Sequence, residues 1–262
     1  MPTSIAVTGK GGVGKTVVSA LTVLTLVEHQ WRPLLAVDAD PNLNLNAALG
    51  LPAEETVGSV REETRRQREA QVGGMTTAEF LNYRIRQSLV EGQGFDLIAM
   101  GRPEGPGCYC YANEILRNAV DRLASEYKAI VMDCEAGLEH LSRRTTGDLD
   151  LMLVVSDPTV RGLETARRAL DLVQEVRSKV GQTKVVLNRV RGELPGFLTE
   201  HAAQLGLAIS ALLPEDEQIT ALDAVGRPFT ELSPDSPLRQ AVAGLLRDCG
   251  LIDGSTGISP VR

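Results

Sequence analysis

Short apolar runs alternate with longer amphipathic stretches along the chain. The runs have the length and the Val, Ile and Leu content of buried strands, and the stretches between them repeat their apolar positions with a helical period. We expect strands at residues 4–8, 33–37, 95–100, 128–133, 151–155, 183–187 and 208–212. We expect helices at residues 15–30, 76–90, 113–126, 161–178, 196–205 and 236–247. Because this alternation is typical of a parallel sheet covered on both faces, we predict an α/β protein with a doubly wound, mostly parallel sheet.

A single domain accounts for the length of the chain. With 262 residues, the chain falls between one and two average domains, and no long linker or internal repeat divides it. We assign residues 1–250 to the domain and residues 251–262 to a flexible tail. Residues 52–92 are expected to form a helical insertion, and the mixed charges at 54–71 are typical of a helix exposed to solvent.

The charge balance argues against two classes of partner. The chain carries 27 Lys and Arg against 34 Asp and Glu, a net charge of −7. A net acidic protein is a poor binder of nucleic-acid phosphates and of anionic membranes. The longest mostly apolar run, residues 17–27, is too short to span a bilayer and is followed by no signal-peptide cleavage pattern. We therefore expect a cytoplasmic protein with neither nucleic acid nor a membrane as its partner.

A glycine-rich loop follows the first expected strand and precedes the first expected helix. Residues 9–16 read Gly-Lys-Gly-Gly-Val-Gly-Lys-Thr and match the pattern G-x-x-x-x-G-K-[ST]. In such a loop the backbone N–H groups surround phosphate oxygens, Lys15 reaches the β- and γ-phosphates, and the Thr16 hydroxyl ligates Mg²⁺. The residues expected to hold the nucleotide here are Gly11, Gly12, Val13, Gly14, Lys15, Thr16 and Val17.

The loop contains a second lysine, Lys10, that a single nucleotide in a single subunit does not need. It resembles the deviant P-loop of the SIMIBI-class family that includes the MinD and ParA ATPases, nitrogenase iron protein and several metallochaperones. The resemblance implies that Lys10 reaches across a homodimer to the partner's nucleotide; a solvated loop lysine is the alternative. Val17 departs from the family, which usually has a hydroxyl residue there, and this removes a contact to the α-phosphate.

Acidic residues stand at the ends of two expected strands. Asp38 and Asp40 follow the second strand, and Asp133 ends the strand at 128–133 in the Walker B position. The resemblance implies that Asp40 orients the attacking water, that Asp38 holds Mg²⁺ through water, and that Asp133 binds a metal-bound water. The amide of Gly137 would then meet the γ-phosphate. A helix N-cap at residues 38–40 is the alternative.

The base is expected to be adenine. Related GTPases read guanine with an Asn-Lys-x-Asp sequence, whereas the matching strand end here reads Asn-Arg-Val-Arg over residues 188–191, with no acid in the fourth place. Asn188 can bond adenine instead, and Pro214 and Glu215 would supply backbone contacts to the base. We therefore expect ATP and ADP as the nucleotides, with Lys10, Lys15 and Asp40 carrying Mg²⁺-dependent hydrolysis.

The four cysteines of the chain divide into a close pair and two single residues. Cys108 and Cys110 are separated by one residue and follow the strand at 95–100, whereas Cys134 and Cys249 have no ligand-like spacing with them. Two thiolates from one loop form half of a tetrahedral or square-planar site, and a second copy of the chain would supply the other half. The metal would be Zn²⁺ or Ni²⁺; two unrelated small residues are the alternative.

Residues 100–110 and 135–144 narrow the resemblance. The Cys-x-Cys loop and the Glu-Ala-Gly-x-Glu-His stretch are similar to those of the CooC-type ATPases and the related AcsF type, over about residues 4–245. This implies an ATP-dependent metallochaperone, a homodimer that binds one metal between its Cys-x-Cys loops and helps to deliver nickel to carbon monoxide dehydrogenase or acetyl-CoA synthase. Three roles stay open for His140: a transient ligand, a relay, or a packed or capping histidine.

Three other functions remain as alternatives. An Fe–S reductase like nitrogenase iron protein would place a second cysteine seven residues after Asp133, where this chain has His140. A positioning ATPase of the MinD or ParA kind would need a membrane helix or a basic DNA surface, against which the acidic balance argues. A generic P-loop ATPase with incidental cysteines is the third.

Overall fold

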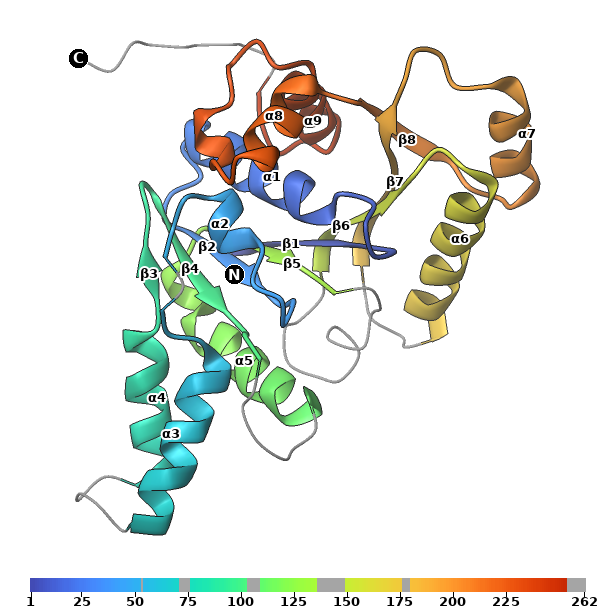
Figure 1. Cartoon of the computed structure of the whole chain (residues 1–262). Helices are drawn as coiled ribbons and strands as arrows, with labels where there is room; N and C mark the ends of the chain where they lie inside the picture. Colours follow the sequence, from blue (N-terminus) through green and yellow to red (C-terminus); the bar gives the residue numbers. More distant parts are fainter. Residues whose placement is uncertain (53, 71–75, 103–108, 136–148, 176–179, 254–262) are drawn as a thin grey trace.

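The structure, a computed structural model, describes residues 1–52, 54–70, 76–102, 109–135, 149–175 and 180–253 (Figure 1). Its described strands form one eight-stranded sheet in the order β3-β4-β2-β5-β1-β6-β7-β8. The strands are β1 Thr3–Gly9, β2 Leu34–Asp38, β3 Val90–Glu91, β4 Phe95–Ala99, β5 Ala129–Asp133, β6 Leu149–Ser156, β7 Val180–Val190 and β8 Ile209–Pro214. All described pairs are parallel except β3 with β4, so the predicted doubly wound, mostly parallel sheet is confirmed.

Helices cover both faces of the sheet (Figure 1). They are α1 Lys15–Glu28, α2 Leu45–Ala48, α3 Val57–Ala70, α4 Thr77–Gln87, α5 Tyr109–Leu123, α6 Val160–Glu175, α7 Gly196–Gln204, α8 Glu217–Ala224 and α9 Pro237–Asp248, with short 3₁₀ turns at Ala124–Glu126 and Phe229–Glu231. One core cluster joins the sheet to α1 and α9, and two others join its opposite face to α3 and α5 and to α6 and α7. Among the described helices none has the length and apolar character that a bilayer crossing requires.

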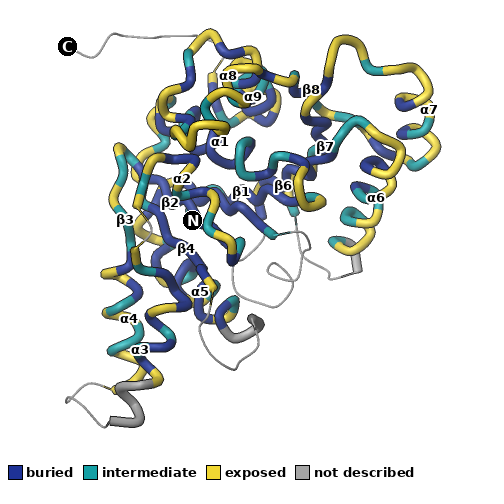
Figure 2. The backbone as a smooth tube through the Cα atoms, viewed as in Figure 1, coloured by how far each residue is buried: buried dark blue, intermediate teal, exposed yellow. Residues whose placement is uncertain are grey.

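Alternation along the central strands explains this two-sided arrangement. In β1, Ile5 and Val7 pack into the cluster beneath α1, whereas Ala6 between them packs into the cluster on the other face. All three side chains have no exposed surface. The central strands are buried on both faces (Figure 2), and this is why the predicted strands read as mostly apolar runs, with buried polar residues such as Asp38 and Asp133 at their carboxyl ends.

The helix α3, which was expected to be exposed to solvent, is partly buried. Val57 and Val60 of α3 are buried against the core that includes α5, and Glu62 is 6% exposed. The buried Glu62 carboxylate forms ion pairs with two arginines: Arg61 Nη1 and Arg65 Nε each lie 3.1 Å from it. Around Glu62 the charges therefore neutralise one another beside a packed face, which corrects the expectation of an exposed helix for residues 57–65.

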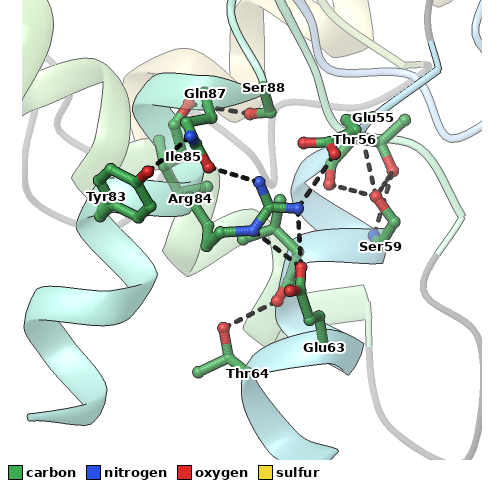
Figure 3. A network of polar contacts seen from close by, with 11 residues as sticks. Glu55, Thr56, Ser59, Glu63, Thr64, Tyr83, Arg84, Ile85, Gln87 and Ser88 are labelled. Carbon is green, nitrogen blue, oxygen red and sulfur yellow. Dashed lines mark hydrogen bonds and ion pairs between the residues drawn. The ribbon is translucent and has the colours of Figure 1, made fainter. Parts of the chain in front are cut away.

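A polar network joins α3 to α4, which lie side by side (Figures 1 and 3). Arg84 Nε donates to Glu63 Oε2 at 2.9 Å and Nη2 donates to Glu55 Oε1 at 3.0 Å, while Nη1 donates to Gln87 Oε1 at 2.7 Å. The Glu63 and Glu55 carboxylates raise the pKa of Arg84 above its usual value. One guanidinium near the end of α4 thus holds two carboxylates, one from α3 and one from the residues just before it.

The packed body runs slightly beyond the predicted domain boundary at residue 250. Trp31 Nε1 donates to the Leu251 carbonyl at 2.7 Å, and Ile252 is 8% exposed and belongs to the core cluster beneath α1. The first residues assigned to the tail therefore pack against the domain. Residues 254–262 lie outside the described part of the chain.

Candidate functional site

The carboxyl ends of three neighbouring strands bring the predicted site together. β5 lies between β1 and β2, with Asp133 paired with Val7 of β1 and with Asp38 of β2. The glycine-rich loop continues directly from β1 into α1 (Figure 1). Because parallel strands end at one edge, residues separated by about a hundred positions in the sequence become neighbours here.

The glycine-rich loop takes a conformation that side chains would prevent. Gly14 has a φ of 90°, and a Cβ placed on it would lie 2.4 Å from Asn188 Nδ2. A Cβ on Gly9 would lie 2.0 Å from the Val155 carbonyl oxygen. Gly12, with a φ of 82°, faces open space, since nothing lies within 4 Å of its Cβ position. The loop is therefore closely backed by β6 and β7 and open on its outer side.

The amino end of α1 is prepared for an anion. Its N-cap, Gly14, offers no side-chain hydrogen bond, and no acidic residue stands in the first turn. The first N–H groups of the helix therefore stay free to donate to a ligand, and they lie at the positive end of the helix dipole. Lys15 is 9% exposed and Lys10 is exposed, with Lys15 Nζ donating to the Lys10 carbonyl at 3.2 Å. Val17 packs partly buried against the core.

Asp133 is held by two hydroxyl groups of α1. Thr16 Oγ1 donates to Asp133 Oδ2 at 2.7 Å, and Ser19 Oγ donates to Oδ1 at 3.0 Å. Burial raises the pKa of Asp133 to about 6, although the two hydroxyl hydrogen bonds act in the opposite direction. The sequence interpretation missed Ser19; its place one helical turn after Thr16 was the available signal, because residues three apart share a helix face.

Asp38 is fully buried beside Asp133. Its Oδ1 accepts from the Asp40 amide and its Oδ2 from the Leu45 amide, both at 3.0 Å. Burial, and then the charge of Asp133, raise the pKa of Asp38 to about 7. Because Leu45 begins α2, Asp38 also does part of the capping expected from the alternative interpretation of this segment.

The turn after β2 carries Asp40, which is partly exposed. Its Oδ1 accepts from the Asn42 backbone N–H at 2.8 Å and from Asn42 Nδ2 at 2.9 Å. The Asn42 Oδ1 in turn accepts from Arg102 Nη2 at 2.5 Å. Neither Asn42 nor Arg102 was recognised from the sequence, because nothing in the pattern connects two residues sixty positions apart.

The end of β7 packs against the glycine-rich loop. Asn188 is 3% exposed and its Nδ2 donates to the Val13 carbonyl at 2.9 Å. Its Oδ1 is buried and has no hydrogen-bond partner among the described residues. An unpaired buried acceptor is costly, so this atom suits a ligand that brings a donor, such as the exocyclic amine of adenine.

Pro214 and Glu215 lie at the end of the neighbouring strand β8. The Glu215 amide donates to the Val190 carbonyl at 3.0 Å, and its carboxylate accepts from Arg191 Nη2 at 2.8 Å. The hydrogen bond from Arg191 lowers the pKa of Glu215. Pro214 and Glu215 therefore lie at the same sheet edge as Asn188, although their predicted contacts to the base stay predictions.

Several predicted residues fall outside the described part of the chain, namely Cys108, Gly137 and His140. The backbone of Cys110 lies in the first turn of α5, while its side chain is not described. Among the described residues no group of three His, Cys, Asp or Glu could hold a metal ion. The metal assignment of Cys108 and Cys110 therefore stays a prediction.

The two single cysteines are buried and free. Cys134 is 1% exposed, and burial raises the pKa of its thiol to about 12. Burial also raises the pKa of Cys249. Thiols that stay protonated are poor metal ligands and poor nucleophiles, and the interpretation of Cys134 as an ordinary core residue is confirmed.

Comparisons with known proteins agree on one nucleotide-binding family. The model of the CobQ/CobB/MinD/ParA nucleotide binding domain matches residues 4–229. An uncharacterised ATP-binding protein of Methanocaldococcus jannaschii is 42% identical over 91% of this chain and 94% of its own length. The carbon monoxide dehydrogenase accessory protein CooC of Rhodospirillum rubrum is 33% identical over 88% of this chain and 90% of its own length.

Solved structures show the same fold at lower identity. A ParA family ATPase from Chlorobium tepidum superposes with a TM-score of 0.70 at 19% identity, covering 93% of this chain and 98% of its own. The MinD cell division protein of Aquifex aeolicus gives 0.67 at 22% identity, covering 99% of both chains. The arrangement of sheet and loop is therefore shared well beyond the range of close sequence similarity.

Proposed function

The chain belongs to the CobQ/CobB/MinD/ParA nucleotide-binding family and is a P-loop ATPase, and we propose that it is an ATP-dependent maturation factor of the CooC type. In this role it assists the insertion of nickel into carbon monoxide dehydrogenase or acetyl-CoA synthase. One observation carries the proposal. The relative named as a carbon monoxide dehydrogenase accessory protein matches almost the whole chain, and a Cys-x-Cys pair follows β4 in the sequence of this chain.

ATP occupies the glycine-rich loop. The backbone of Gly11, Gly12, Val13 and Gly14 surrounds the phosphates, which is supported by the open space over Gly12 and the uncapped amino end of α1. Lys15 binds the β- and γ-phosphates. Asn188 Oδ1 receives the amine of adenine, and the backbone of Pro214 and Glu215 borders the base.

Thr16, Asp38 and Asp133 hold Mg²⁺, with the two carboxylates acting through water. Their oxygen donors suit this hard cation, and the two carboxyls are buried side by side, where burial raises both pKa values and a bound cation would stabilise the charged form. When bound, Mg²⁺ neutralises charge on the phosphates. Thr16 and Ser19 keep the Asp133 carboxylate oriented toward the loop.

Asp40 orients the attacking water, and Lys10 stabilises the phosphates of the partner subunit's nucleotide in a homodimer. The exposed position of Lys10 and the partly exposed position of Asp40 support these roles, since both groups must reach substrate. The amide of Gly137 contacts the γ-phosphate. Val17 lies beside the α-phosphate and contributes its backbone rather than a hydroxyl.

Cys108 and Cys110 bind Ni²⁺ or Zn²⁺ together with the same pair of a second copy. Two thiolates leave half of a four-coordinate site open, and a two-fold dimer completes it. ATP closes the dimer through Lys10 and so changes the geometry of the thiolates, which captures or releases the metal.

The metal site is tested by metal content. Wild type, Cys108→Ala/Cys110→Ala and the matched control Cys134→Ala are loaded with Ni²⁺ or Zn²⁺, with and without ATP, and analysed for bound metal and molecular mass. We expect one metal per dimer in wild type and control and none in the double variant. A double variant that keeps both its metal and its dimer removes the assignment.

Hydrolysis and the client are tested separately. Asp40→Ala is expected to lower kcat by on the order of 100-fold or more while ATP still binds, as befits a residue acting on the attacking water. Nickel-dependent activation of the purified apo client by the wild-type protein and ATP identifies the client. Activation equal to that with nickel alone contradicts the maturation role.

Other proteins with this fold suggest two alternative functions, and each has its own test. MinD relatives and ParA-like structures make a positioning function the main competitor. ATP-dependent sedimentation with anionic vesicles or with DNA, in the absence of a nickel effect, would favour it. A brown Fe–S absorption near ~400 nm in protein purified without oxygen would favour a reductase instead.

A further inference from the structure

One buried carboxylate joins the amino ends of two helices just beyond β8. Asp216 is 6% exposed and is the N-cap of α8, where its Oδ1 accepts from the Gln218 amide at 2.9 Å. Its Oδ2 accepts from the Ser236 hydroxyl at 2.6 Å and from the Leu238 amide at 3.2 Å, both at the start of α9. A helix cap needs only the first of these contacts. The second oxygen therefore ties the turn after β8 to a helix that begins about twenty residues later in the chain.

Ser236 completes this contact from the side of α9. Its side chain has no exposed surface, its hydroxyl donates to Asp216, and its oxygen accepts from the Arg239 amide at 3.1 Å. Burial acts to raise the pKa of Asp216, but the hydrogen bonds from the Ser236 hydroxyl and from backbone amides lower it below the usual aspartate value. The Asp216 carboxylate is therefore charged at neutral pH, and the protein itself supplies its hydrogen-bond donors.

The turn that Asp216 holds includes the backbone proposed to border the base. Pro214 ends β8 and pairs with Val190 of β7, and the Glu215 amide donates to the Val190 carbonyl at 3.0 Å. Two residues before Val190 in the sequence, Asn188 carries the buried, unpaired Oδ1 that is proposed to receive the adenine amine. The turn is thus fixed on one side to the strand that carries Asn188 and on the other side, through Asp216, to α9.

The phosphate loop is held by other contacts. Asn188 Nδ2 donates to the Val13 carbonyl at 2.9 Å, a contact in which Asp216 takes no part. α9 packs beside α1 (Figure 1), and Arg239 of α9 pairs with Glu28, the last residue of α1 and the one farthest from the loop. A disturbance at Asp216 therefore reaches the turn after β8 directly, and it reaches the phosphate loop only along the whole length of α1.

We propose that Asp216, held by Ser236, is a positioning residue for base recognition, which sets the backbone of Pro214 and Glu215 against the adenine without touching the nucleotide. This rests on the proposed binding of ATP with its base beside Asn188 and that backbone. Backbone N–H and C=O groups recognise a base through hydrogen bonds, which weaken when the groups move by about 0.5 Å. Asp216 therefore contributes to the affinity for ATP and to the preference for ATP over GTP, and it does not contribute to binding of the phosphates alone.

The experiment compares Asp216→Ala with the control Asp150→Ala in the full-length protein. Asp150 Oδ2 accepts from the Ser4 amide at 2.8 Å and from the Ser4 hydroxyl at 3.0 Å, so it makes the same two kinds of contact near the amino end of β6, at the opposite edge of the sheet. Titration calorimetry with Mg²⁺, below the Tm of each variant, gives the affinities for ATP, GTP and inorganic triphosphate. We expect Asp216→Ala to bind ATP on the order of 10-fold more weakly than wild type and triphosphate within about 2-fold of it.

The ratio of the affinities for ATP and triphosphate is the decisive measurement, because a general loss of stability would lower both affinities together. In Asp216→Ala this ratio and the preference for ATP over GTP are expected to fall, whereas Asp150→Ala should keep both wild-type values. Equal losses for ATP and triphosphate overturn the proposal, and so does a folded Asp216→Ala protein with the wild-type affinity for ATP.

Two milder variants decide the question if Asp216→Ala does not fold. Ser236→Ala removes one hydrogen bond to Asp216, and Asp216→Asn keeps the shape of the side chain and one acceptor oxygen, so each should lower the ratio by about 3-fold. An unchanged ratio in both variants overturns the positioning role.

The wild-type protein separates a failure of this role from a failure of the proposed function. If wild type binds ATP no more tightly than triphosphate, the proposed base site beside Asn188 has itself failed. If wild type prefers ATP and the preference survives in all the variants of Asp216 and Ser236, the base site stands and the role of Asp216 alone is rejected.

Discussion

Two clusters of charged residues in this molecule are built on opposite rules. At the sheet edge, Asp38 and Asp133 are buried side by side, and their pKa values are raised to about 7 and about 6. Between α3 and α4, Arg84 is surrounded by Glu55 and Glu63, whose charges raise its pKa further. The first cluster gathers like charges, and the charge of Lys15 lowers the pKa of Asp133 only in part. The second cluster pairs opposite charges.

The difference separates a binding site from a structural contact. Opposite charges that satisfy each other need no further partner, and they fix two helices in register. Like charges buried together destabilise the free protein, and binding of a proton or of a metal cation relieves this repulsion. Such a site is destabilising when empty and stabilised when a cation binds. This suits the proposed binding of Mg²⁺ together with a nucleotide.

The largest expected effect comes from the loop beside the acidic pair. Gly14→Ala forces a left-handed φ and a contact of 2.4 Å with Asn188 Nδ2, so ATP affinity should fall on the order of 100-fold. Isothermal titration with ATP measures it. The matched control is Gly206→Ala, which has a φ of 65° but nothing within 4 Å of its Cβ position, so it should lose only about 1 kcal/mol of stability and no affinity.

The acidic pair itself should appear in the pH dependence of stability. Because the folded pKa values of Asp38 and Asp133 lie above the usual aspartate value of 3.8, the folded chain holds more protons than the unfolded chain between about pH 4 and pH 7. Rising pH through this window therefore lowers their contribution to the free energy of unfolding, by roughly 2 kcal/mol or more in total. Thermal unfolding in EDTA, without nucleotide, measures the effect.

Two controls belong to that measurement. Asp38→Asn removes one of the titrating groups, so its Tm should fall less between pH 5 and pH 7.5 than that of wild type, and Mg²⁺ with ATP should abolish the fall in wild type. An equal fall of Tm with pH in both proteins would mean that the buried carboxyls do not cause the pH dependence of stability.

The opposite-charge cluster predicts a smaller loss, confined to stability. Arg84→Ala removes the partner of Glu55 and Glu63, which are both more than a third exposed. We therefore expect the free energy of unfolding to fall by about 1 kcal/mol and Tm to fall by a few degrees. Arg86→Ala, which breaks a pair of exposed groups, should cost less. ATP hydrolysis should be unchanged in both variants; a drop in kcat for Arg84→Ala would show that α3 and α4 influence the nucleotide edge.

The smallest expected effect is at Cys134, next to Asp133 in the sequence. Since its thiol is buried and its pKa is raised to about 12, Cys134→Ala should leave metal content, kcat and reaction with thiol reagents in the native state unchanged. Loss of bound metal in this variant would extend the metal site to a residue that the structure describes as part of the core.

The strands and the phosphate loop were accessible from the sequence because both are local signals. A buried parallel strand is mostly apolar, and a phosphate loop needs glycines at a fixed spacing. Residues 3–9 and 9–16 could therefore be recognised from the sequence. The convergence of Asp38 on Asp133 also followed, from the rule that parallel strands end at one edge. β3 was missed since two residues are too short to show a pattern.

The contacts that tune the site were not accessible. Ser19 reads as one more small residue in an apolar helix until Asp133 is seen beside it. Arg102 and Asn42 are exposed polar residues in two separate loops, and only the order of β2 beside β4 brings them together. The burial of Glu62 was hidden because a charge is read as exposed unless its partners, Arg61 and Arg65, are already placed.

Asn188 sets a limit on how the base preference of this protein could be re-engineered. The same amide that offers Oδ1 toward the nucleotide side uses Nδ2 to hold the Val13 carbonyl of the phosphate loop. Replacing it with aspartate to recruit a guanine-like donor would set a carboxylate against that carbonyl, and replacing it with alanine would release the loop. With the proposed role of Asn188 in binding the base, one side chain would serve both base recognition and loop order, and a change of nucleotide would require a second substitution that holds Val13 by other means.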